Sequence, residues 1–352
     1  MSTLLRSTAV AAVLASPLAA HAGAPTLSDV FKASGITESG YLDAGFNYNN
    51  RQFNAAPFTY GGANVDSFTL NQVGLTLSST PAAGIGGVVD ILGGRDAGAI
   101  PSDAGSDIVF KQAYVQWAGE SSTLMGGRFA TLAGYEVIAS NANLNATRSL
   151  LFFYQPLTHT GVRGAFKLAN AVTLTGGVNN SALGSTNDPN EQKTVELQLA
   201  LTPADGVALY FTGYTGNEAA GGAPSQTPTL IDFVGSFTVG SVGLGVNVDL
   251  LDYDTASNTE TDGVAVYASF GATDKLKLNL RGEYVKTDDD VALTRKQKEL
   301  TVTAAYSAAS NFDLVTDLRF DKDDASPFVA AYSAVPAEDS MMTVAVKGIY
   351  KF

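Results

Sequence analysis

The chain has 352 residues, a formal net charge of −13 and no cysteine. The missing thiols exclude disulfides and thiolate metal sites, and we expect no cofactor. The acidic balance argues against a nucleic-acid partner, because nucleic-acid binding needs a basic surface.

The first 22 residues have the pattern of a secretory signal peptide. Arg6 precedes an apolar run that ends near Ala20, and Ala20-His21-Ala22 forms a small-x-small cleavage site. The run is too short for a membrane-spanning helix, which needs about 20 residues. We therefore expect residues 1–22 to be removed and residues 23–352 to form a single domain. A short buried helix is the alternative.

From Gly35 onward, segments of about ten residues alternate apolar and polar side chains. Val195, Leu197 and Leu199, for example, alternate with Glu196 and Gln198. A period of two puts the two sets on opposite faces of a strand, and tilted membrane strands have about 9–11 residues. We expect about sixteen strands, an even number as in bacterial single-chain barrels. Their spans are 36–48, 67–78, 84–93, 108–118, 123–132, 159–168, 171–180, 193–202, 206–217, 229–239, 242–254, 262–271, 275–286, 298–307, 312–321 and 341–352.

The connections alternate in length: Gly119–Ser122 and Pro203–Asp205 are short, whereas Ser181–Gln192 and Lys322–Ser340 are long. Bacterial barrels carry short periplasmic turns and long extracellular loops. Every backbone group in lipid needs an internal partner, so the sheet must close. The sequence therefore predicts an all-β fold, a transmembrane antiparallel β-barrel in the outer membrane, with the N- and C-termini in the periplasm.

The longest connection, residues 133–158, is too apolar at its end to move freely in water, with the run Leu150 to Tyr154. We expect it to fold back against the inner wall and narrow the lumen. The alternative is an external loop that caps the barrel or packs on a neighbouring subunit. The predicted constriction residues are Glu136, Asn141, Asn143, Asn145 and Arg148.

The polar strand faces are hydrophilic enough to line the aqueous lumen that sixteen strands leave. Arg or Lys facing lipid near the midplane would cost about 2–4 kcal/mol, whereas facing water costs little. We expect a wall of mixed or slightly basic charge. The predicted wall residues are Gln112, Gln116, Arg128, Arg163, Lys277, Arg281, Glu283, Arg319 and Lys347.

One stretch, roughly residues 110–163, resembles the β-barrel porin type-two family of Gram-negative outer membranes. The resemblance implies an outer-membrane barrel with a channel role, and it brings no substrate. The segment Gly94–Asp107, rich in small residues, departs from the family pattern, so nothing carries over to it. The matching segments are Phe110–Gln116, Gly126–Phe129, Gly134–Ile138, Asn141–Ser149 and Thr158–Val162.

We therefore expect a porin, a passive diffusion channel for small polar solutes or ions. Its expected partners are outer-membrane lipid and lipopolysaccharide, and a homotrimer is an expectation from porins at large. The alternatives are a structural or adhesive barrel acting through its extracellular loops, a barrel enzyme, and a soluble exported β-protein. We expect no enzyme, since His159 is the only histidine after the signal, although one histidine would suffice as a base.

Ion preference stays open at this point. Basic lumen residues suggest anions, whereas acidic loops such as Asp288-Asp289-Asp290 suggest cations. These loops either bind divalent cations that bridge lipopolysaccharide phosphates or form a solvated charged rim.

Overall fold

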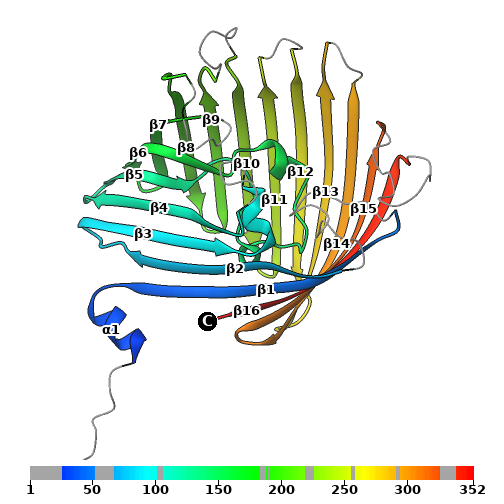
Figure 1. Cartoon of the computed structure of the whole chain (residues 1–352), viewed down its shortest axis with the longest axis horizontal. Coiled ribbons are helices and arrows are strands. Elements are labelled where there is room, and N and C mark those ends of the chain that lie inside the picture. Colours follow the sequence, from blue (N-terminus) through cyan, green and yellow to red (C-terminus); the bar gives the residue numbers. More distant parts are fainter. Residues whose placement is uncertain are drawn as a thin grey trace, which may run out of the picture.

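The computed structural model describes residues 26–51, 67–100, 106–182, 188, 190–218, 226–254, 258–290, 294–325 and 338–352. Sixteen antiparallel strands close into one barrel, with β16 paired to β1 (Figure 1). The predicted fold is confirmed. The predicted signal peptide, residues 1–22, lies outside the described residues.

Each predicted span overlaps one strand, and no strand end differs from its prediction by more than three residues. The strands are β1 (Thr37–Asn49), β2 (Ser67–Ser79), β3 (Gly84–Gly93), β4 (Ile108–Ala118), β5 (Ser122–Ala130), β6 (Thr158–Ala169), β7 (Val172–Asn179), β8 (Thr194–Ala204), β9 (Val207–Thr215), β10 (Thr229–Val239), β11 (Val242–Asp252), β12 (Glu260–Gly271), β13 (Leu276–Asp288), β14 (Arg295–Ala309), β15 (Phe312–Asp323) and β16 (Ser340–Lys351).

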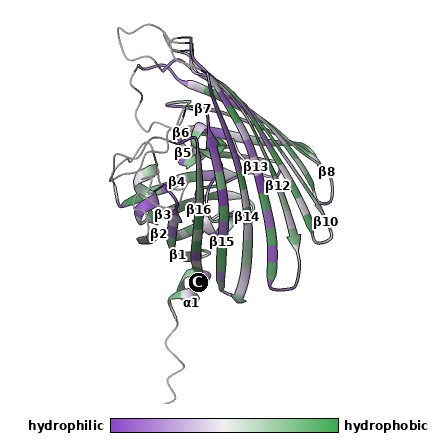
Figure 2. Cartoon of the chain, turned by 90° about the vertical axis from the view of Figure 1, so that its right-hand side faces the viewer, coloured by the Kyte–Doolittle hydropathy of each residue, from purple (hydrophilic) through white to green (hydrophobic). Residues whose placement is uncertain are grey.

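Among the described residues, four short helical elements accompany the strands: α1 (Leu27–Ala33), η1 (Arg95–Ala99), η3 (Ser140–Ala142) and α2 (Leu151–Tyr154). The strand pattern predicted none of them. None of the helices in the described part of the chain is long and apolar enough to cross a membrane. Figure 2 places α1 and the C-terminus at the same end of the barrel.

The two faces of the wall differ in polarity. Successive side chains of a strand point to opposite faces, and apolar and polar residues alternate along the strands. Outward residues such as Leu197 and Val266 are 54% and 53% exposed, whereas inward residues such as Glu196 are buried. Green and purple bands alternate along the strands in Figure 2. A bulge in each of β2 and β4 lets two successive polar residues face inward. In β4 these residues are Lys111 and Gln112.

The segment Thr131–Leu157 between β5 and β6, here called the inner loop, lies inside the barrel. It lies within the ring of strands in Figure 1. Each of the four buried apolar clusters in the described part of the chain joins inner-loop residues to inward-facing wall residues, and one also includes Ala97 of η1. Leu150 and Leu151, for instance, pack against Tyr267 and Val285. The inner loop is therefore a packed element of the interior and not an external cap.

Candidate channel constriction

The inner loop enters the lumen along β9 to β11. Tyr214 Oη on β9 accepts a hydrogen bond from Leu132 N at 2.8 Å, and Asp232 Oδ2 on β10 accepts one from Gly134 N at 3.2 Å. Gly134 has a φ of 93°, and a Cβ there would lie 2.1 Å from Gln155 Oε1. The turn into the lumen therefore needs glycine at this position.

The next contact is aromatic. The ring of Tyr135 stacks on that of Tyr267 of β12, with centroids 4.2 Å apart and planes 19° apart. A Cβ on Gly245 of β11 would lie 2.5 Å from Tyr135 Cε2, so the wall is hollowed where the ring rests. Burial raises the pKa of Tyr135 above its usual value, and the neighbouring Glu136 adds to this rise. The ring therefore stays neutral at physiological pH.

Arg281 of β13 joins the wall to the middle of the inner loop. Its side chain is fully buried. Nη1 donates to Glu136 Oε1 and to Thr147 O, both at 2.8 Å, while Nε donates to Glu299 Oε2 at 3.0 Å. Glu283 Oε2 accepts the Leu150 amide at 2.7 Å. Buried charges are tolerated when they are paired and hydrogen-bonded in this way.

A second anchor lies on β15. Asp317 accepts hydrogen bonds from the Ala146 and Thr147 amides at 3.0 and 2.7 Å, and from Thr303 Oγ1 at 2.7 Å. Arg319 Nη1 donates to the carbonyl oxygen of Arg148 at 2.6 Å. Carboxylates bond strongly to backbone amides, so this stretch of the inner loop is held firmly to the wall.

The third anchor is Gln72 on β2. Its amide nitrogen donates to Ile138 O at 3.0 Å and to Asp96 Oδ2 at 2.9 Å, and its oxygen accepts from Ser140 N at 3.0 Å. Burial raises the pKa of Asp96 above its usual range, against the opposing effect of Lys347. The η1 segment lies in the region that departs from the family pattern. Through Asp96 and Gln72, it therefore supports the inner loop.

The predicted constriction residues lie in the inner loop but take different roles. Glu136, Asn145 and Arg148 are buried, and Arg148 donates to Val137 O and Ile138 O within the loop. Asn143 is half-buried and also donates to loop carbonyls, whereas Asn141 is exposed. Arg148 thus holds the loop's own shape, whereas Glu136 accepts both the Ser149 amide of the loop and Arg281 of the wall.

Eight of the nine predicted wall residues lie on inward rows; the strand pairing places Arg128 on the outer face instead. It pairs with Ala113 and Thr160, whose rows are outward. The neighbouring Phe129 faces the lumen, where the guanidinium of Arg163 lies 4.1 Å from its ring centre. The prediction that Arg128 faces the lumen is therefore wrong, and Phe129 takes the inward position in a cation–π contact with Arg163.

The lumen was predicted to be mixed or slightly basic, and the buried charges are mixed with an excess of carboxyl groups, not of basic ones. Among the described residues, twelve carboxyl side chains but only six lysines and arginines are buried inside the barrel. Prediction missed Asp43, Asp90 and Lys111 on the wall. Asp43 pairs with Lys347 at 3.1 Å, and Asp90 with Lys111 at 2.9 Å. Their alternation with apolar neighbours could have revealed both aspartates, but the β4 bulge hides Lys111 from any strict two-residue pattern.

Open space remains beside the inner loop. A cavity of about 530 Å³ lies between the loop and the wall strands β8, β9, β10 and β12. A smaller one of about 280 Å³ adjoins Lys111 and Gln112. Most side chains that line the larger cavity are neutral and polar or aromatic, among them Tyr135, Asn143, Gln198, Tyr210, Ser236 and Tyr267.

A family model described as "Putative beta-barrel porin-2, OmpL-like" matches residues 35–352. The chain belongs to this family. This porin is therefore an outer-membrane channel protein. Its inner loop packs on the inward-facing wall and narrows the lumen. No curated protein sequence matches the chain. No group of three or more potential metal ligands occurs within the described ranges.

Solved porins share the fold. The anion-selective porin from Comamonas acidovorans has a TM-score of 0.65 at 15% identity, covering 90% of this chain and 99% of that one. The outer membrane channel DcaP of Acinetobacter baumannii has a TM-score of 0.63 at 14% identity, covering 90% and 97%. OmpT of Vibrio cholerae in its trimer form has a TM-score of 0.61 at 15% identity, covering 90% and 99%. At sequence identities this low, the similarity shows that the folds are alike.

Proposed function

We propose that this porin is a passive diffusion channel for small polar solutes, and that uncharged solutes pass beside the inner loop. One observation carries the proposal: the anchored loop leaves a cavity of about 530 Å³ with a mostly neutral, polar and aromatic lining. Hydroxyl and amide groups can replace water around a polar solute, and aromatic rings can contact its apolar faces. Neither interaction requires a charge on the solute.

Ion selectivity is expected to be weak. Arg281 is paired with Glu136 and Glu299, and Arg163 with Glu196, so most of their field cancels locally. Selectivity depends on the charge at the narrowest point. The excess of buried carboxyl over basic side chains favours cations slightly.

Export, orientation and the absence of catalysis belong to the same proposal. We infer that residues 1–22 direct export, that the termini lie in the periplasm and that the barrel catalyses no reaction. The buried ring of His159 stacks on Tyr214 at 4.7 Å, and its Nδ1 donates to Ser181 O at 3.0 Å. These contacts favour a structural histidine, because a general base must reach its substrate.

Purified protein in planar bilayers tests the channel proposal. We expect stepwise, ohmic currents, a small reversal potential of the cation-favouring sign in a salt gradient, and liposome swelling with small uncharged sugars that stops as the sugars become larger. A folded barrel that gives neither currents nor swelling would refute the channel and favour the structural or adhesive alternative. A large anion-favouring reversal potential would refute the selectivity argument alone.

A homotrimer is also proposed, and Arg128 supports it. An arginine on the outer face costs about 2–4 kcal/mol in lipid near the midplane but little within a polar contact between subunits. Around it, the outer wall is hollowed by small residues such as Ala113 and Gly126, beside a groove of about 450 Å³. A cysteine at Ala113 should cross-link to a second copy, whereas one at Val266, on the opposite part of the wall, should not.

A further inference from the structure

Four lysines gather on the outer face of β13, β14 and β15, where these strands end beside the long connections. Lys298 lies opposite Lys322, and Lys286 lies opposite Lys296 in the neighbouring strand pair. These positions are outward because they keep the alternation of Leu300, which is 46% exposed. Lys296 and Lys298 are exposed, and the side chain of Lys322 is 64% exposed. Asp262 lies opposite Lys286, Asp288 is paired with Lys286, and Asp324 lies beside Lys296. The local excess of positive charge therefore lies at Lys298 and Lys322.

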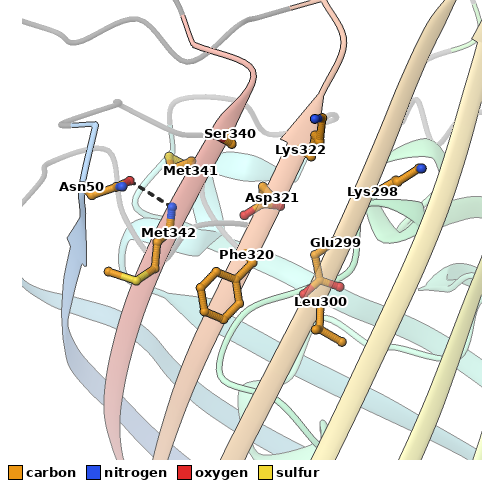
Figure 3. A pocket seen from close by; sticks show the side chains of 10 residues that line it. All are labelled: Asn50, Lys298, Glu299, Leu300, Phe320, Asp321, Lys322, Ser340, Met341 and Met342. Atoms are coloured by element: carbon orange, nitrogen blue, oxygen red, sulfur yellow. Dashed lines mark hydrogen bonds between the residues drawn. The ribbon is translucent and has the colours of Figure 1, made fainter.

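An apolar groove of about 430 Å³ lies next to the lysines, two residues farther along the strands and away from the long connections. Leu300, Phe320 and Met342 line its outer side, with Lys298 and Lys322 at its edge (Figure 3). Two residues along a strand span about 6.6–6.8 Å. The lysines therefore lie one such step beyond the apolar contacts, toward the ends of the strands.

We propose that this surface binds a phosphorylated lipid, with an acyl chain in the groove and a headgroup phosphate between Lys298 and Lys322. An outward lysine is costly in hydrocarbon but nearly neutral at the interface, and the cross-strand neighbour of Lys298 is Tyr284, as expected of an aromatic girdle. Two ammonium groups on adjacent strands attract a phosphate, and the groove beside them is apolar. This binding is separate from the channel function.

Nearby carboxylates leave room for that phosphate. Lys322 Nζ lies 3.3 Å from Asp339, and Lys286 is paired with Asp288, but both pairs are exposed and contribute little. Glu299 and Asp321 also line the groove, from its inward side. Their charges are paired with Arg281 and Arg319. A phosphate can therefore replace the exposed aspartates without meeting an unpaired buried carboxylate.

Binding to the detergent-solubilised barrel tests the proposal, with apparent Kd values from native mass spectrometry and heat-modifiable gel migration as the check of folding. The probes are bisphosphorylated lipid A, the same lipid without phosphates, and inorganic phosphate. The test variant is Lys298→Gln/Lys322→Gln. The matched control is Lys193→Gln/Lys275→Gln, which removes the same charge from exposed lysines elsewhere.

We expect the test variant to weaken binding of the phosphorylated lipid roughly 30-fold, while the control stays within about 2-fold of the wild type. Lys298→Arg/Lys322→Arg should retain binding, and Phe320→Ala should weaken binding of both lipid forms. Equal affinities of the test and control variants would overturn the proposal. So would inorganic phosphate binding as tightly as the lipid, or a change in subunit number without a change in lipid binding, which would make a second copy the occupant.

Discussion

Replacing Arg281 by methionine should release the inner loop. The change keeps much of the side chain's volume but removes the cation that Glu136, Glu283 and Glu299 surround within 2.8–3.3 Å. Glu136 belongs to the loop and the other two to the wall, so their repulsion acts directly between loop and wall. Thr147 O also loses its donor.

Removing one partner of a buried ion pair costs about 3–5 kcal/mol. At 1.36 kcal/mol for each tenfold change, this lowers the docking equilibrium of the loop roughly 10²- to 10⁴-fold. The Asp317 and Gln72 anchors remain, so we expect the barrel to fold while its loop leaves the wall for part of the time.

Single-channel recordings should then show a larger and noisier conductance, and the thermal unfolding temperature should fall. Arg281→Met/Glu299→Gln, which removes one charge of each sign, should recover part of the wild-type behaviour. Arg295→Met is the control, since Arg295 pairs with Asp323 between two wall strands and its side chain is 40% exposed. Wild-type conductance and unfolding temperature in the Arg281 variant would refute the anchoring argument.

Three other changes test the same interior. Asp317→Ala leaves two loop amides without their acceptor, at about 1–3 kcal/mol each, and should raise conductance and lower the unfolding temperature; unchanged values would contradict the anchor. Gly245→Val should displace Tyr135 and cost about 1–3 kcal/mol, whereas Gly243→Val, whose Cβ would have no neighbour nearer than 3.7 Å, should alter conductance less; equal effects would count against the stacked position. Burial raises the pKa of Asp96, so the folded state holds its proton more tightly and loses stability as pH rises from the ordinary aspartate range through the raised value. Unfolding temperatures between about pH 4 and pH 7 should fall less in Asp96→Asn, and parallel curves for the two proteins would exclude this linkage.

The positions of the strands could be derived from the sequence, because the two-residue period is a local property of each strand. Leu197 and Glu196 must face opposite sides of any strand that contains both. The apolar end of the inner loop was also predictable, since Leu150 and Leu151 have no stable place in water. The short helices could not be foreseen in the same way. α2, for example, has only four residues, and wall contacts hold it in place.

The amino-acid sequence alone thus determined that alternating segments form a closed wall with a polar interior and a long, partly apolar loop. Only the tertiary structure decided which face a residue takes where the alternation is ambiguous, as at Arg128, and which charges meet. Arg281 and Glu136 lie 145 positions apart in the sequence. Their pairing depends on the path of the loop and on the register of every strand between them. Local periodicity contains neither, because both arise from closing the barrel as a whole.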